Sequence, residues 1–111
     1  MFDPYMFVIN SVPAPENRYY NKVGGAAVHI WVMDTEAQSA LDRAKDYIRR
    51  YQWEPQEVEY AFQIDPARVD GYHKQEVELY HQAVQFGIAA MFVGWQKEDH
   101  PGDPTLMLPP K

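Results

Sequence analysis

Glu78 and His81 are the residues whose types and spacing come closest to a metal-binding motif. They lie three positions apart in a segment with helical periodicity, which is the spacing of the Glu-x-x-His ligands in helical di-iron proteins. Such a site needs two of these motifs and two further glutamates, whereas this chain has one motif. His73 is eight positions from His81, which is about 12 Å along a helix and too far to share one ion. We therefore expect no metal site.

The sequence also lacks the common nucleophile motifs. Ser11 and Ser39 are the only serines, and neither stands in a Gly-x-Ser-x-Gly sequence. There are no cysteines, which excludes disulfides, thiolate zinc sites and cysteine nucleophiles. Gly24 and Gly25 are not followed by the Lys-Ser/Thr pair of a phosphate-binding loop. We expect no catalytic residues and no cofactor.

An aromatic and apolar stripe runs along one side of a predicted strand. In the segment AAVHIWVM, residues 26–33, one alternation carries His29, Trp31 and Met33. If the intervening valines and isoleucine face the helices, this stripe faces away from them, and Trp95 of a later strand joins it. Exposed apolar patches rich in aromatic residues and methionine usually mark interfaces. The stripe therefore predicts an association surface.

A long loop before that strand supplies an alternative. Residues 13–25 are rich in proline, asparagine and glycine, and loops of this length often carry function. Tyr19 and Tyr20 are its least loop-like part. A pocket between this loop and the His29 face would make the protein a small-molecule binder or a small enzyme.

The charge balance points to a basic partner and away from nucleic acid. The formal net charge is −6 and the estimated pI is 5.0, whereas nucleic-acid binders usually carry a basic patch. The basic cluster at residues 43–50 is interleaved with aspartates, which is typical of a solvated helix face. An acidic edge, formed by Glu54, Glu57 and Glu59, would attract a basic partner protein.

Hydrophobic periodicity predicts four strands. Apolar runs indicate strands at residues 5–12, 26–33, 57–64 and 88–95. The third run alternates most clearly, so we expect one of its faces in the core and the other in water. The expected inward residues are Val58, Tyr60, Phe62 and Ile64, with Glu57 and Glu59 outward.

Apolar residues at spacings of three and four predict two helices. The first begins near Thr35, where Thr35 and Gln38 fit a capping box, and runs to about Tyr51. The second runs from about Gly71 to Phe86. Gly87 fits its C-terminal cap, because glycine adopts the left-handed conformation readily.

This order of elements predicts an α+β fold in one domain. We expect a four-stranded sheet with two helices on one face, in a ferredoxin-like sandwich with ββαβαβ order. The domain would span residues 1–95, and the proline-rich residues 96–111 would form a C-terminal tail without a folded element. The start of the chain does not resemble a signal peptide and no apolar run is long enough to cross a membrane, so we expect a cytoplasmic protein.

Several stretches carry a resemblance. GGAAVHIWV, AQSALDRAKDYI with its aromatic end YQW, and HQAVQFGIAAMFVGW resemble a loose group of small bacterial α+β proteins of uncharacterised function. The resemblance covers residues 24–95 and consists of a strand, an alanine-faced helix and a glycine between helix and strand. It supports the fold and supplies no activity.

These observations predict a small non-enzymatic protein that associates through an apolar aromatic sheet face. The association would be a homodimer or a complex with a partner protein, without nucleic acid or membrane. One alternative is an acidic immunity or inhibitor protein that neutralises a basic toxin. The other is a small-molecule-binding protein or enzyme with a pocket near His29.

Overall fold

A computed structural model describes residues 2–97 and 105–108 of the 111-residue chain. The elements in chain order are β1 (Asp3–Pro13), β2 (Val23–Asp34), α1 (Ala37–Arg50), β3 (Trp53–Gln63), the 3₁₀ helix η1 (Pro66–Gly71), α2 (Lys74–Phe86), β4 (Ile88–Gln96) and β5 (Thr105–Leu108). None of the described helices is both long enough and apolar enough to span a bilayer.

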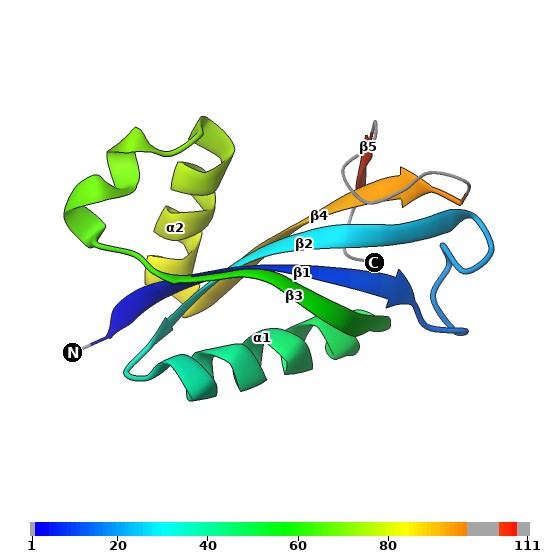
Figure 1. Ribbon diagram of the computed structural model, residues 1–111, viewed down its shortest axis with the longest axis horizontal. Coiled ribbons are helices and arrows are strands. Elements are labelled where there is room, and N and C mark those ends of the chain that lie inside the picture. The colour runs from blue at the N-terminus through cyan, green and yellow to red at the C-terminus, as the bar shows by residue number, and fades with distance from the viewer. Residues whose placement is uncertain (1, 98–104, 109–111) are drawn as a thin grey trace.

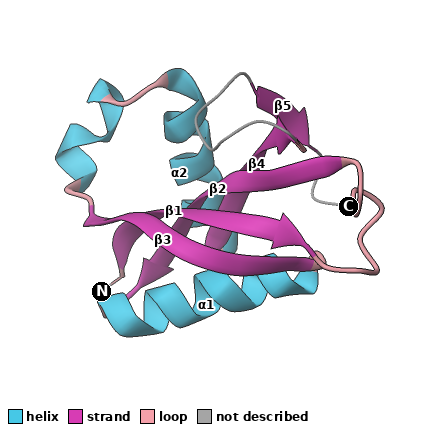
Figure 2. Cartoon of the chain, turned by 45° about the vertical axis from the view of Figure 1, so that its right-hand side comes forward, coloured by secondary structure: helices cyan, strands magenta, loops and turns pink. Residues whose placement is uncertain are grey.

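The strands form one sheet in the order β3-β1-β2-β4-β5, with every neighbouring pair antiparallel. The α+β class is therefore confirmed. The ferredoxin-like arrangement is wrong, because this strand order does not match it. The two helices also do not share a face, since α1 and α2 lie on opposite sides of the sheet (Figures 1 and 2).

The central strands explain why both faces of the sheet are covered. Strand β2 is apolar at nearly every position, and a strand of this kind is usually buried on both sides. On one side, Val28, Ile30 and Val32 pack with α1 in the larger core. On the other side, Trp31 packs with α2 in a second core. The sheet is therefore the middle layer of three.

The start of α1 differs from the predicted capping box. Helix α1 begins at Ala37, and its N-cap residue makes no side-chain capping bond. Asp34, at the end of β2, instead accepts hydrogen bonds from the Thr35 and Glu36 amides and from the Ser39 hydroxyl. Its carboxylate thus orders the turn that leads into α1, where we expected a capping box of Thr35 and Gln38.

Strand β3 differs most from its predicted pattern. Its pairing with β1 shifts twice, so that Gln56 and Glu59 are extra residues on β3. Each such bulge changes which side chains share a face. Val58 therefore packs toward α1, whereas Tyr60 and Phe62 turn to the α2 side and are 51% and 50% exposed. The prediction that these two aromatic side chains are buried is wrong.

The C-terminal segment contains one strand that we did not expect. Thr105–Leu108 pairs with β4 and extends the sheet, so the prediction of a tail without a folded element is wrong for these residues. Residues 98–104 and 109–111, which include His100, lie outside the described part of the chain.

Candidate functional site

His29 and Trp31 of β2 converge on one carboxylate of α2. The Nδ1 atom of His29 lies 2.9 Å from Oε2 of Glu76, and the indole nitrogen of Trp31 donates to Oε1 at 2.8 Å. Alternation along β2 places both side chains on the α2 side of the sheet. The first turn of α2 places Glu76 above them.

Glu76 is held in its ionised form. Desolvation by its surroundings raises the pKa of this carboxyl, but hydrogen bonds from His29 and Trp31 lower it more, and the net pKa lies below its usual value. An ionised carboxylate only accepts hydrogen bonds, so Nδ1 of His29 carries the shared proton. In the neutral ring, Nε2 is then the acceptor.

An imidazole oriented in this way resembles the base of a nucleophilic site. However, the hydroxyls of both serines are engaged elsewhere. Ser11 donates to the Ile9 carbonyl and Ser39 donates to the Asp34 carboxylate. Neither serine is therefore available for activation by His29. The His29–Glu76 pair instead links β2 to α2.

The predicted open aromatic face is partly covered. Trp31 is completely buried, and Tyr72 and Tyr80 pack edge-on against it at ring distances of 5.9 and 5.8 Å. Met33 is half-buried in the same core. The prediction that this stripe faces away from both helices is wrong, because α2 covers it. Trp31 therefore offers no surface to a partner.

The uncovered part of this face lies over β1 and β3. Glu57 pairs with Asn10, and Tyr60 pairs with Val8. Paired residues share a face, so Glu57 and Tyr60 lie on the α2 side. The Tyr60 and Phe62 rings stack at 6.1 Å with an interplanar angle of 17°. We call the exposed residues Glu57, Glu59, Tyr60 and Phe62 the acidic-aromatic patch.

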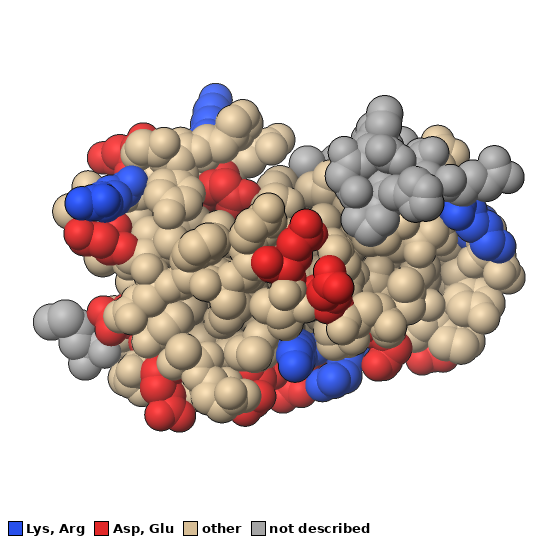
Figure 3. Space-filling model, in the orientation of Figure 1, with Lys and Arg blue, Asp and Glu red and all other residues tan. Residues whose placement is uncertain are grey.

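Acidic side chains dominate the strands of this face, although Arg68 of η1 lines a pocket together with Phe62. Strands β1 to β4 contain no lysine or arginine. Figure 3 shows acidic side chains in the middle of the face on which β3 lies in Figure 1, with basic side chains below them, where α1 lies. Glu54, the third residue of the predicted acidic edge, is 4.0 Å from Arg49 of α1 and does not belong to the patch.

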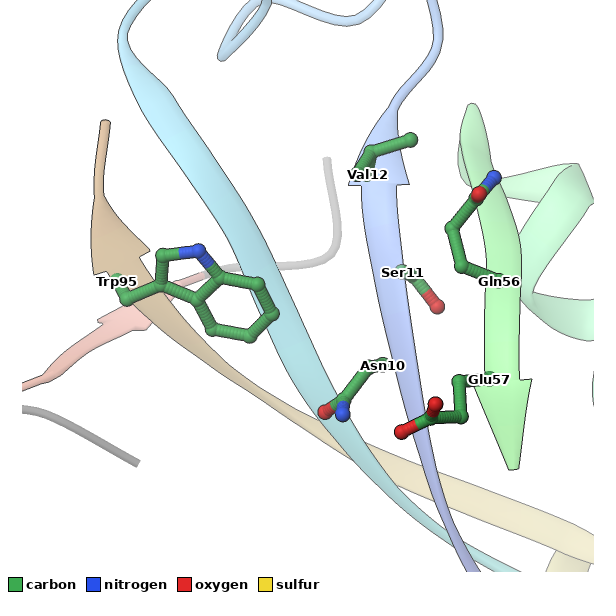
Figure 4. Close-up of a pocket in the computed structure, with 6 residues that line it drawn as sticks. All are labelled: Asn10, Ser11, Val12, Gln56, Glu57 and Trp95. Carbon is green, nitrogen blue, oxygen red and sulfur yellow. The ribbon is translucent and has the colours of Figure 1, made fainter. Parts of the chain in front are cut away.

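A pocket of about 240 Å³ opens beside the patch. Six residues line it: Asn10, Ser11, Val12, Gln56, Glu57 and Trp95 (Figure 4). Trp95 was predicted as an interface residue, and the structure brings it close to Glu57. Asn10 was missed, although it is the one amide in the apolar run YMFVINSV. A polar side chain in such a run was the available signal.

Tyr19 and Tyr20 lie away from His29. The Tyr19 ring packs against Trp53 at 6.2 Å in the core on the α1 side, whereas His29 is on the α2 side. Tyr20 is exposed. The structure therefore does not bring the predicted loop and the His29 face together into one pocket.

The histidines and carboxylates considered for metal binding are dispersed. Glu78 and His81 are both exposed on α2, and the His81 ring packs against Tyr80 at 5.4 Å. Within residues 2–97 and 105–108, no three histidine, aspartate or glutamate side chains are placed to hold one ion.

Comparisons with known proteins add no assignment. No family model, no curated protein and no solved structure matches this chain.

Proposed function

We propose that this protein is a non-enzymatic binding module whose acidic-aromatic patch docks a basic partner protein. The supporting observation is the pair of stacked, half-exposed rings of Tyr60 and Phe62 beside the exposed carboxylates of Glu57 and Glu59. Exposed aromatic groups are enriched at protein interfaces. A positive surface would complement the carboxylates and steer the encounter. The resemblance to small bacterial proteins is compatible with this role and adds no activity to it.

The charge of the patch favours a different protein over a second copy of this chain. In a homodimer built on this patch, the glutamates of both copies would approach one another, and like charges across an interface are unfavourable. A basic partner would instead neutralise them. The homodimer, which the sequence also predicts, is the competing outcome of the experiment below.

The structure of β3 favours binding of a partner through the side chains of the patch over pairing of a partner strand with the edge of the sheet. Strand β3 is at the edge of the sheet, and exposed edges can pair with another chain. However, the extra residues Gln56 and Glu59 interrupt its ladder. Bulges of this kind are a common protection against edge pairing.

The experiment compares two patch variants with a control on the opposite side. Glu57→Lys reverses one patch charge, and Tyr60→Ser with Phe62→Ser removes the rings. Asp46→Lys makes the same charge change on α1, where the Asp46 side chain is 72% exposed. All are exposed, so we expect stability changes within about 0.5 kcal/mol per charge reversal.

Proteins retained from cell lysate by the wild type and by Asp46→Lys, but lost by both patch variants, are identified, purified and titrated. The proposal expects a basic protein that forms a stoichiometric complex and binds more weakly at high salt, since screening weakens charge steering. Identical binding by all variants would contradict the proposal. A wild-type dimer that both patch variants dissociate would replace it with the homodimer.

A further inference from the structure

The pocket beside the patch is shaped by two adjacent glycines. The Trp95 indole lies over Gly24 and Gly25 of β2, where a Cβ on either residue would collide with the ring. Figure 4 shows the indole extending across β2 toward β1, while the Asn10 and Glu57 side chains border the same space. The glycines thus allow a tryptophan from β4 to form a wall opposite β3.

Asn10, which lines this space, carries a buried acceptor without a partner among the described residues. Its Nδ2 atom donates to Oε2 of Glu59 at 2.9 Å, and a carboxylate can only accept, so this bond fixes which end of the amide is the nitrogen. The other end, Oδ1, is buried and has no hydrogen-bond partner among residues 2–97 and 105–108. The residue is only 9% exposed. A buried acceptor without a donor is unfavourable, so this position suits a ligand that brings an N–H group.

The lining is mainly apolar, and the acceptors at its edge would complement a cation with several donors. Glu57 adds a carboxylate to the Asn10 oxygen, and the strands around the pocket contain no lysine or arginine to occupy these acceptors. The volume of about 240 Å³ is below the roughly 300–1,000 Å³ of sites for drug-sized ligands. The volume therefore suits a group of the size of one side chain.

We propose that this pocket receives the guanidinium group of an arginine side chain. That this arginine belongs to the basic partner protein rests on the proposed function. A guanidinium is planar, always charged and weakly hydrated, so it packs against an aromatic wall and presents several N–H groups at once. It would donate to Asn10 Oδ1 and to the Glu57 carboxylate together. A lysine ammonium is compact and strongly hydrated, and so fits the Trp95 wall less well.

The first experiment titrates the wild-type protein with blocked amino acids. The probes are N-acetyl-arginine methylamide, its lysine counterpart, its citrulline counterpart and free L-arginine. The readout is the NMR signal of the Trp95 indole N–H, assigned by its loss in Trp95→Phe. We expect a saturable shift with the blocked arginine, a weaker one with lysine and none with citrulline, which is planar but neutral.

Two variants test the assigned contacts. Glu57→Gln keeps the shape and removes the charge, and we expect binding of blocked arginine to weaken by roughly tenfold or more, as for a lost charge-assisted hydrogen bond. Asn10→Leu removes the acceptor and should also weaken binding. Glu54→Gln on the same strand is the control and should bind as the wild type does, because Glu54 is outside the pocket lining. Glu57 is exposed, so its variant folds even if Asn10→Leu does not.

Four outcomes would overturn the inference, and the first three concern the probes and the Glu57 variant. These three are equal binding of citrulline and arginine, no shift of the Trp95 signal, and unchanged binding after Glu57→Gln. Much tighter binding of free L-arginine than of the blocked residue would also overturn it, because the source would be a metabolite. Because these probes need no partner protein, the pocket can prove unable to bind arginine while salt-dependent binding of a basic protein is still observed. Conversely, the blocked arginine can bind to the pocket even if the lysate experiment finds no basic partner protein.

Discussion

Trp31 is a structural residue, because its ring fills the space between β2 and α2. It is completely buried and donates a hydrogen bond to Glu76. We expect Trp31→Ala to lower the free energy of unfolding by roughly 3–5 kcal/mol, as for other large core aromatics. Trp31→Phe keeps most of the ring but loses the hydrogen bond, so we expect about 1–3 kcal/mol. Urea denaturation followed by circular dichroism measures both. A loss near zero for Trp31→Ala would mean that α2 does not cover this face in solution.

Asp34 makes the stability of the protein depend on acid pH. Desolvation raises the pKa of this carboxyl. Hydrogen bonds from Ser39, Arg43 and two backbone amides lower the pKa by more, so that it is about 2 instead of 3.8. A carboxyl whose pKa is lower in the folded state than in the unfolded state stabilises the fold at pH values above its unfolded-state pKa. That stabilisation is lost as the pH falls from about 4 to about 2.

We therefore expect Asp34→Asn to be less stable than the wild type at neutral pH and to show a smaller loss of stability in acid. Glu76, whose pKa is also lowered, keeps part of the acid dependence in this variant. Denaturant midpoints measured between pH 2 and pH 7 test the expectation. Asp46→Asn, at an exposed position on α1, is the control and should follow the wild-type curve. An unchanged curve for Asp34→Asn would contradict the prediction.

At the scale of the elements, sequence periodicity predicted the strands and helices but not the layers. Gly87 ends α2 in the left-handed conformation as expected, with φ of 88°, because only local backbone geometry decides that position. The placement of α2 depends on which side of β2 it covers. The apolar run of β2 indicates cover on both sides, and the expected two-layer sandwich disregarded this indication.

The face of Tyr60 and Phe62 was not predictable from alternation alone. The pattern of β3 is a regular period of two in the sequence, yet two extra residues opposite β1 change its register. A bulge has no signature in one strand read by itself, because it is defined by pairing with the neighbour. For the same reason, the pocket formed by Asn10, Glu57 and Trp95 could not be assembled from three separate strands.

Gly25 tests the packing of Trp95 against β2. A Cβ there would meet the Trp95 ring and would lie 2.6 Å from the Ser11 carbonyl oxygen, so the strand or the ring must shift. We expect Gly25→Ala to destabilise the fold by about 1–3 kcal/mol, as for overpacking in a core, and to move the indole signal of Trp95. Gly71→Ala is the matched control, since a Cβ there meets nothing within 4 Å. Equal thermal unfolding midpoints for Gly25→Ala and Gly71→Ala would contradict this explanation.

At the scale of the whole molecule, charge is distributed unevenly between the faces. The formal net charge is −6, but the positive charges of residues 43–50 lie on α1, and strands β1 to β4 contain no lysine or arginine. A partner with a positive surface would therefore approach the patch side. In the proposed function, the carboxylates beside Tyr60 and Phe62 would also oppose contact between the half-exposed rings of separate molecules, as charged residues do at sheet edges.

Neutralising these carboxylates should therefore promote self-association. We expect Glu57→Gln with Glu59→Gln to associate at protein concentrations at which the wild type does not, because the rings remain exposed while the repulsion is gone. Glu59→Gln keeps an oxygen that can accept from Asn10, so the fold should persist. Asp42→Asn with Asp46→Asn removes the same charge from α1 and is the control. Sedimentation velocity over a concentration series measures all three proteins. If the wild type is already a dimer and the patch variant is no more associated, the carboxylates do not oppose self-association, and the homodimer replaces the basic partner as the occupant of this face.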